Sequence, residues 1–571
     1  MANLRPILLI TLVFLAYLIW LEWQKDYGPQ PVAQAPAKVQ TDTTTGTPDV
    51  PVMGEPGSSA EPPADLPDIN DSVAMAGQQN SDQTSPQQTP VQRQTVEVVT
   101  DVLRLEIDLT GGTVVVAELL DYAETVENPE QKVVLLQPSG PKTFLAQSGL
   151  LSHQSAPNHT SVYSASQNNW ALSADQDTLE VPLTWRSDDG VEVTKRFILN
   201  RNQYDITVLH EVRNSGEATW LGSRYDQLQR AASTDEGGSG FNNPERYSFN
   251  GIGFYDAEDK FQKVDYDDVV DEPFKKTVSG GWLAMVQHYF FAAWIPPTEE
   301  LVTYSTQQVT TNGQTRYIAR DVSPAVQVAP GATATFTSRL YVGPKLQDDL
   351  PQIAPGLEHT VNYGIFTVFS KPLFWLLEKI HDYVGNWGWS IILLTVLIKL
   401  AFLKLTEAQF RSTARMRKLQ PRIEQLKERY GDDRQRMSQA MMEMYKTEKV
   451  NPLGGCLPIL VQIPIFIALY WVLIESVELR QAPFILWIEN LSARDPYFVL
   501  PALNAIFMIA TQRLTPMVGM DPVQRKMMSA MPVVFSVLFA FFPAGLVLYW
   551  ATNAGLSLAQ QVYITRKIER S

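Results

Sequence analysis

Six long apolar segments mark this chain, and all but the first fall after residue 384. They are Pro6–Trp23, Trp387–Leu405, Leu453–Ile474, Tyr497–Gln512, Met527–Phe542 and Leu546–Val562. A helix needs about 20 apolar residues to cross the hydrocarbon core of a bilayer. The pattern therefore predicts a membrane α-helical bundle with six transmembrane crossings, of which the last three are short.

Residues 94–345 follow a different period, because apolar and polar residues alternate there as they do in half-buried strands. Val96–Leu109, Tyr204–Val212 and Thr333–Val342 all alternate in this way. Asp188-Asp189-Gly190, between two such runs, is typical of a β-hairpin turn. We predict a large all-β sandwich over residues 94–345.

Three further segments complete the organisation. The first apolar segment lies within residues 1–27, and we expect an uncleaved anchor. A signal peptide is the alternative, although the nearest small-residue site, Ala33-Gln34-Ala35, lies far beyond the apolar core. Residues 28–93 are rich in Pro, Gln, Thr and Ser, a composition that predicts a disordered linker. Residues 346–384 then connect the β domain to the helical part, residues 385–571.

An amphipathic helix is predicted over Val361–Val384, where apolar residues recur at spacings of three and four. Ser370, just before Pro372, is its expected start. Because a predicted crossing follows directly, we expect this helix to lie in the membrane interface. An ordinary core helix would have the same pattern.

The two parts of the chain differ sharply in charge. Residues 361–571 carry 23 Lys and Arg against 15 Asp and Glu, whereas residues 1–360 carry 23 against 46. Since cytoplasmic loops are enriched in Lys and Arg, we expect the basic segment Arg411–Lys449 and both termini in the cytoplasm and the β domain outside. The basic side could contact nascent chains, ribosomal RNA or anionic lipid, and charge alone does not choose between them. With one cysteine and six histidines at no ligand spacing, no disulfide, metal or other cofactor is expected.

Residues 406–452 are predicted to form a cytoplasmic helical hairpin. Its first helix, Glu407–Tyr430, should break or bend at Pro421, and Asp432 or Asp433 should cap the second. Two sets of side chains are candidates for client or ribosome contact: the basic residues Arg415, Arg417 and Lys418, and the stripe formed by Met437, Met441 and Met444. The alternatives are a solvated basic face and a stripe that only packs the two helices together.

Lys399 is the most unusual residue of the apolar segments, because a buried ammonium is costly in a bilayer. Thr395 lies one helical turn before it, and Tyr549, Asn553 and Ser557 follow one another at successive turns of the last segment. Further polar residues on neighbouring segments are Gln462 and Asn504. If these faces converge, they line a hydrated, positively charged groove. Otherwise Lys399 snorkels to the interface and the polar groups only bond helix to helix.

Several long motifs closely resemble the YidC membrane-protein insertase family, in its Gram-negative form. They are Met416–Pro421 (MRKLQP), Gly431–Asp433 (GDD), Tyr445–Pro458 (YKTEKVNPLGGCLP), Gln462–Phe466 (QIPIF) and Phe542–Trp550 (FPAGLVLYW). The resemblance implies a five-helix core around a hydrophilic groove, a periplasmic β-supersandwich, and contacts with the Sec translocon and the ribosome. The family's groove arginine falls on Lys399, which keeps the charge but loses the bidentate fork. Its groove-mouth threonine falls on Thr395, and the second aromatic of its last-span pair falls on Trp550.

Three functions compete at this stage. The leading hypothesis is an insertase and chaperone of the inner membrane, not an enzyme, that moves short polar segments of nascent membrane-protein clients across the bilayer. A small-solute transporter is the alternative, although we find no clear internal repeat of the kind common in transporters. A membrane-tethered carbohydrate enzyme would need a carboxylate pair or a histidine in a cleft of the β domain.

Overall fold

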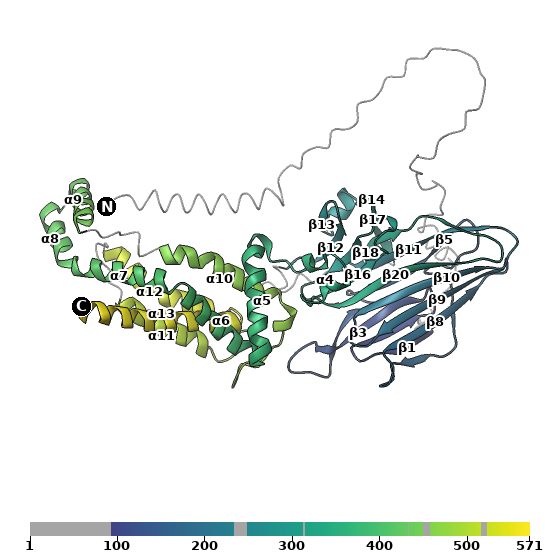
Figure 1. The fold of residues 1–571 in the computed structure, drawn as a ribbon, viewed down its shortest axis with the longest axis horizontal. Coiled ribbons are helices and arrows are strands. Elements are labelled where there is room, and N and C mark those ends of the chain that lie inside the picture. The colour runs from purple at the N-terminus through teal and green to yellow at the C-terminus, as the bar shows by residue number, and fades with distance from the viewer. Residues whose placement is uncertain are drawn as a thin grey trace, which may run out of the picture.

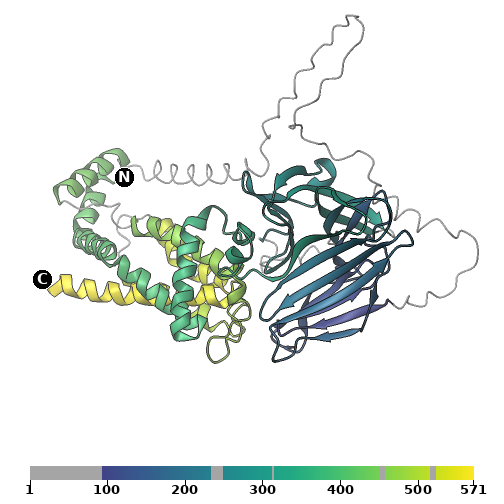
Figure 2. The ribbon, with the colours of Figure 1, turned by 45° about the vertical axis from the view of Figure 1, so that its right-hand side comes forward.

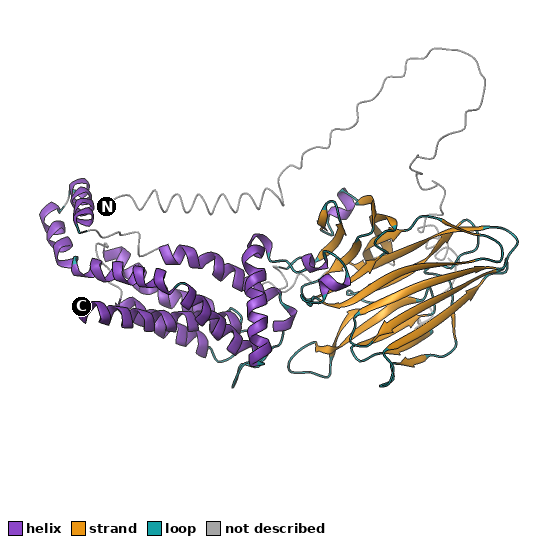
Figure 3. Cartoon of the chain, in the orientation of Figure 1, coloured by secondary structure: helices purple, strands orange, loops and turns teal. Residues whose placement is uncertain are grey.

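The computed structural model describes residues 93–232, 248–311, 314–431, 433–448, 457–514 and 522–570. The predicted anchor and nearly all of the predicted linker lie outside these residues. Strands fill one region and helices the other, and the two regions lie side by side (Figure 1, Figure 3). The predicted large all-β domain and the predicted helical region are both confirmed.

Two sheets form the β domain. The first, with eleven described strands, has the order β14 (Lys275–Ser279), β17 (Leu301–Thr311), β18 (Gln314–Val322), β11 (Trp220–Ala231), β5 (Phe144–Ser152), β3 (Thr113–Ala123), β2 (Leu103–Asp108), β1 (Thr95–Val99) and β7 (Asn169–Ala171), with β19 (Val326–Val328) on β11 and β4 (Lys132–Leu136) on β3. The second, with nine, has the order β13 (Lys260–Val264), β12 (Gly251–Asp256), β15 (Trp282–Val286), β16 (Phe290–Ile295), β20 (Thr333–Pro344), β10 (Asp205–Asn214), β9 (Val191–Asn200), β8 (Thr178–Arg186) and β6 (Ser164–Ala165).

Alternation decides which side chains enter the core. Every second residue of β9 is buried, from Val191 to Leu199. One of these inward positions holds Lys195, whose Nζ donates to the backbone oxygens of Gly111, Gly112 and Ser148 at 2.8–3.0 Å. Three acceptors offset part of the cost of burying the ammonium. Burial still lowers the pKa of Lys195 to about 7.

The hairpin prediction is confirmed, because β8 and β9 pair antiparallel around the turn that contains Gly190. The alternating run Val96–Leu109 contains two strands. The chain reverses there, and β1 pairs with β2. Thr100 makes the turn, since its Oγ1 accepts from the backbone N of Leu103 at 3.0 Å.

Two short helices, α3 (Asp268–Asp271) and α4 (Leu350–Ile353), accompany the β domain. The helical region consists of longer helices. They are α5 (Thr367–Val384), α6 (Trp387–Ala401), α7 (Leu403–Lys418), α8 (Gln420–Tyr430), α9 (Arg434–Thr447), α10 (Leu457–Glu475), α11 (Val499–Leu514), α12 (Pro522–Phe539) and α13 (Ala544–Arg570). Short 3-10 turns are η2 (Leu357–Thr360), η3 (Gly364–Phe366) and η5 (Val477–Leu479). The hairpin of α8 and α9 and the end of α13 lie far from the β domain (Figure 2).

One predicted span is bent. Trp387–Leu405 was expected as a single helix, but the helix ends at Ala401 and resumes at Leu403 after a turn of 62°. Phe402, at the break, has φ −95° and ψ 10°, outside the helical range. Among the described residues, only this bent pair combines the length and apolar character of a membrane span, and no single helix does. The count of six crossings remains a prediction.

The amphipathic helix lies within the predicted range Val361–Val384 but begins at neither Val361 nor Ser370. Helix α5 starts at Thr367, so Ser370 is not its first residue. Ser370 is fully buried instead, and its Oγ donates to the backbone oxygen of Ala468 in α10 at 3.1 Å. Its hydroxyl therefore joins two helices and does not cap one.

A polar junction joins the β domain to the loop after α10. Arg480 donates to the backbone oxygens of Ala123 and Glu124, at the end of β3, at 2.8 and 3.1 Å. One oxygen of Glu478 accepts from the backbone N of Gln347 at 3.1 Å, while the other is buried without a hydrogen-bond partner. These contacts span up to 357 positions in sequence, so only the folded chain assembles them.

We expect Glu478→Gln to raise the melting temperature of the full chain at pH 8 and to leave it nearly unchanged at pH 4.5. Burial raises the pKa of Glu478 from 4.5 to about 7. The folded protein therefore binds the proton more tightly, and the contribution of this group to stability falls as pH rises from about 4.5 to 7. The uncharged amide escapes this loss, which is on the order of 3 kcal/mol.

Thermal unfolding of the purified protein in detergent measures the effect. Glu489→Gln, at an exposed position of the same loop, is the matched control and should show no such pH dependence. An equal shift of the melting temperature at both pH values would contradict the assignment.

Candidate functional site

Lys399 lies in the last turn of α6, just before the bend at Phe402. Its Nζ donates to Oγ of Ser557 in α13 at 2.7 Å. Ser557 in turn donates to the backbone oxygen of Asn553, one turn earlier, also at 2.7 Å. The ammonium is therefore held against a neighbouring helix, whereas a snorkelling lysine would extend toward the end of its own helix.

A second polar contact joins α10 to α13. Nε2 of Gln462 donates to Oδ1 of Asn553 at 2.7 Å. Asn553 thus accepts two hydrogen bonds, from Gln462 at its side-chain oxygen and from Ser557 at its backbone oxygen. Lys399 extends the series by donating to Ser557. Four polar residues on three helices form one connected chain inside an apolar bundle.

A small cavity of about 30 Å³ lies beside this chain and is lined by Lys399, Thr406 and Gln462 together with apolar residues. The apolar lining consists of Ile398, Phe402, Leu405 and Ile465. A water molecule needs about 10–15 Å³ of such space and two or more polar partners. The cavity therefore has room for about two waters, and its polar groups suit them.

Aromatic side chains border the polar chain. Trp550 packs edge-on against Phe466 of α10, with ring centroids 4.6 Å apart, and against Phe539 of α12 at 4.9 Å. Tyr549 is buried and stacks at 6.4 Å on the same Phe466. The aromatic cluster therefore connects α10, α12 and α13 next to the polar residues.

Two residues of the predicted stripe do not join this chain. Thr395 is buried, and its Oγ1 donates to the backbone oxygen of Ile391 in its own helix at 2.7 Å. Asn504 is also buried, and its Nδ2 donates to Sδ of Met508 on the same helix at 3.5 Å. Thr395 is satisfied within its own helix, as Ser and Thr side chains often are. Oδ1 of Asn504, in contrast, is buried without a hydrogen-bond partner among the described residues.

Ser557 is the site residue whose role the sequence analysis did not predict. It belonged to the expected stripe on the last segment, but nothing in its spacing distinguished it from Asn553. Which hydroxyl meets the ammonium depends on how α6 and α13 are packed together. The spacing of four from Asn553 was the only available signal.

The predicted helical hairpin is present, although its first helix begins at Leu403 and not at Glu407. Helix α7 ends just before Gln420–Pro421, and Oδ1 of Asp433 caps α9 by accepting from the backbone N of Arg436 at 3.1 Å. Met437 and Met441 are buried, and Met441 packs with Leu419 and Ile423 between the helices; Met444 is partly buried beside them. Packing of the hairpin accounts for this arrangement, and client contact through the stripe remains a prediction.

The basic residues of the hairpin lie on α7. Arg415 is exposed there, while the side chains of Arg417 and Lys418 lie outside the described residues. An exposed guanidinium is available to a partner, but exposure alone does not identify one.

The β domain holds a buried cluster of charges. Arg224 forms ion pairs with Asp226 and, at 2.6 and 3.5 Å, with Glu300 and Asp321. Arg224, Asp226 and Asp321 are 0% exposed, and burial raises the pKa of Asp321 well above its ordinary value. Because they are fully buried, Asp226 and Asp321 do not line a cleft that a sugar could enter.

Comparison with known proteins identifies the family. Residues 95–376 match the family described as the YidC periplasmic domain, and residues 379–571 match the 60Kd inner membrane protein family. The membrane protein insertase YidC of Thioalkalivibrio sulfidiphilus is 48% identical over 100% of this chain and 99% of its own length. The same-named protein of Nitrosococcus oceani is 44% identical over 100% of both chains. A crystal structure of active YidC insertase with the first transmembrane domain resolved aligns with 82% of this chain and 93% of its own, at 21% identity and a TM-score of 0.37. This chain belongs to the YidC family of membrane protein insertases.

Proposed function

We propose that this inner membrane insertase moves short polar segments of its clients past the polar chain that links Lys399, Ser557, Asn553 and Gln462, and then releases their helices into lipid. The observation that carries the proposal is the 2.7 Å bond from Nζ of Lys399 to Ser557 of α13. A charge held between two helices is available to a passing segment, and no bond of the client is made or broken.

The physical reason is the cost of polar groups in hydrocarbon. An unsatisfied backbone group in lipid costs several kcal/mol, whereas a hydrated, positively charged path lowers that cost for an acidic or neutral tail. The cavity beside Lys399 has room for about two waters only. A client must therefore part the helices further, and the bend at Phe402, with the apolar faces of α6 and α10 around it, is the position we propose for that opening.

We expect Lys399→Glu to slow the insertion of clients with acidic translocated tails by about tenfold or more, because like charges repel strongly at low dielectric. Clients with neutral tails should be slowed less, and Lys399→Arg should retain activity. The measurement is insertion of a single-span protein into liposomes that contain the purified chain, alone or together with the Sec translocon. Insertion by the chain alone would establish the translocon-independent route.

Lys404→Glu is the matched control, because Lys404 is exposed on the neighbouring helix α7. It should leave both classes of client unaffected. Normal insertion of acidic-tailed clients by both Lys399→Ala and Lys399→Glu would show that the charge has no role, and the polar path would then depend on Gln462, Asn553 and Tyr549 alone.

We further propose an orientation with both termini and the hairpin in the cytoplasm. The basic Arg411–Lys449 segment supports it, and so does the distance of the hairpin and the end of α13 from the β domain (Figure 1). The first apolar segment would then be an uncleaved anchor that precedes the periplasmic domain.

Single cysteines in a Cys456→Ser background test this orientation. A membrane-impermeant maleimide should label Ser164→Cys, in the β domain, in intact spheroplasts. It should label Ser412→Cys and Ser571→Cys only after the membrane is opened. Labelling of Ser412→Cys in sealed spheroplasts would exclude the six-crossing arrangement.

Contact with the ribosome is proposed for the basic residues of α7. Charge reversal at Arg415, Arg417 and Lys418 should weaken co-sedimentation with ribosomes, and binding should fall steeply with salt if phosphates are contacted. Charge reversal at Arg436, which is exposed on α9 but pairs with Asp433 at 3.2 Å, is the comparison variant. Unchanged binding at low and physiological salt would leave these residues as a solvated face.

A further inference from the structure

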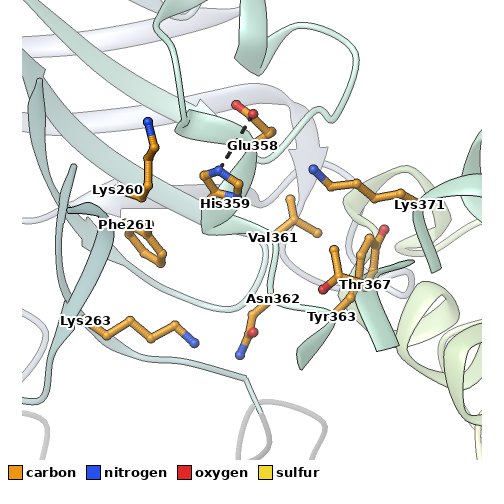
Figure 4. A pocket seen from close by; sticks show the side chains of 10 residues that line it. All are labelled: Lys260, Phe261, Lys263, Glu358, His359, Val361, Asn362, Tyr363, Thr367 and Lys371. Atoms are coloured by element: carbon orange, nitrogen blue, oxygen red, sulfur yellow. Dashed lines mark ion pairs between the residues drawn. The ribbon is translucent and has the colours of Figure 1, made fainter. Parts of the chain in front are cut away.

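A pocket of about 300 Å³ lies where the β domain meets α5 (Figure 4). Its walls come from the β12–β13 hairpin, from the connector that leads into α5, and from α5 itself. The residues that line it are Lys260, Phe261, Lys263, Glu358, His359, Val361, Asn362, Tyr363, Thr367 and Lys371. Its size is at the lower end of the range for ligand pockets, about 300–1,000 Å³, so it suits a small head group and not a whole lipid or peptide domain.

The lining carries an excess of positive charge, with three lysines against one glutamate. Lys263 and Lys371 reach toward the pocket from opposite walls, whereas Lys260 points away, and its Nζ donates to the backbone oxygen of Ala257 at 2.7 Å (Figure 4). Glu358 turns toward His359, with 4.0 Å between Oε1 and Nε2. Nζ of Lys263 also lies 5.1 Å from the centroid of the Phe249 ring, a contact that leaves its charge in place. The positive charge of both lysines favours an anion in the pocket.

An apolar surface continues from the pocket along α5. Val368 and Trp375, three residues before and four after Lys371, lie on the same helical face and are 78% and 58% exposed. Phe369 and Ile365 beside them are each 48% exposed. Since an amphipathic helix with such a face lies in the membrane interface, acyl chains would cover these residues while a head group reached Lys371.

We propose that this pocket binds the head group of an anionic phospholipid of the outer leaflet, with its phosphate between Lys263 and Lys371 and its acyl chains along the exposed face of α5. A ligand with a charged head and apolar chains matches the charge of the pocket and the apolar surface that borders it. Such a lipid would join the hairpin of the β domain to α5 and so fix how the domain sits on the membrane.

The test is native mass spectrometry of the purified full chain in neutral detergent, titrated with dioleoylphosphatidylglycerol. A lysine near an anionic surface contributes about fivefold in affinity, so Lys263→Gln with Lys371→Gln should weaken the tightest binding event by about 30-fold. Lys263→Arg with Lys371→Arg should retain it. Both lysines are exposed, so neither change should unfold the protein, and circular dichroism checks that.

Lys142→Gln with Lys275→Gln is the matched control, because both residues are exposed on the β domain and neither lines the pocket. An equal loss in this control would overturn the proposal, as would equal binding of dioleoylphosphatidylcholine. If inorganic phosphate bound as tightly as the lipid, the site would be one for free phosphate. If a pentaglutamate peptide displaced the lipid at a concentration below that of the lipid, the pocket would be a site for acidic polypeptide instead.

Discussion

An ammonium group among apolar helices needs polar partners, and that need organises the helical region. Lys399 bonds to Ser557, Ser557 to the backbone of Asn553, and Asn553 to Gln462, so that α6, α10 and α13 are linked by consecutive bonds of 2.7 Å. Removal of one partner would leave a buried polar group unpaired, which costs about 1–3 kcal/mol. The proposed function relies on the same charge, because charges act more strongly on one another where the dielectric is low.

The junction with the β domain follows the same rule outside the membrane part. Arg480 and Glu478 lie in the loop after α10 and are paired with backbone groups at Ala123, Glu124 and Gln347. Backbone partners do not depend on the identity of a facing side chain, so the junction tolerates change on the β domain more easily than an ion pair would. This geometry couples the large domain to the end of α10, the helix that also carries Gln462.

The patterns that predicted structure well were local ones. Strand alternation located β10 and β20, and Gly190 marked a hairpin, because the period of two and a positive φ are properties of a few adjacent residues. The alternating run Val96–Leu109 divides into two strands because the hydroxyl of Thr100 turns the chain without Gly or Pro. The bend at Phe402 was missed for a related reason, since neither Gly nor Pro marks it in the sequence.

The sequence by itself determined the division into a β domain and an apolar helical region, the asymmetry of charge between them, and the exceptional position of Lys399. These follow from composition and period, which act over short distances along the chain. Only the tertiary structure decided that Lys399 meets Ser557, that Thr395 and Asn504 contact their own helices and not the polar chain, and that Met441 packs the hairpin. Each of these outcomes depends on which faces of two helices pack together. The spacing of residues within one segment does not specify how a neighbouring helix is rotated about its own axis.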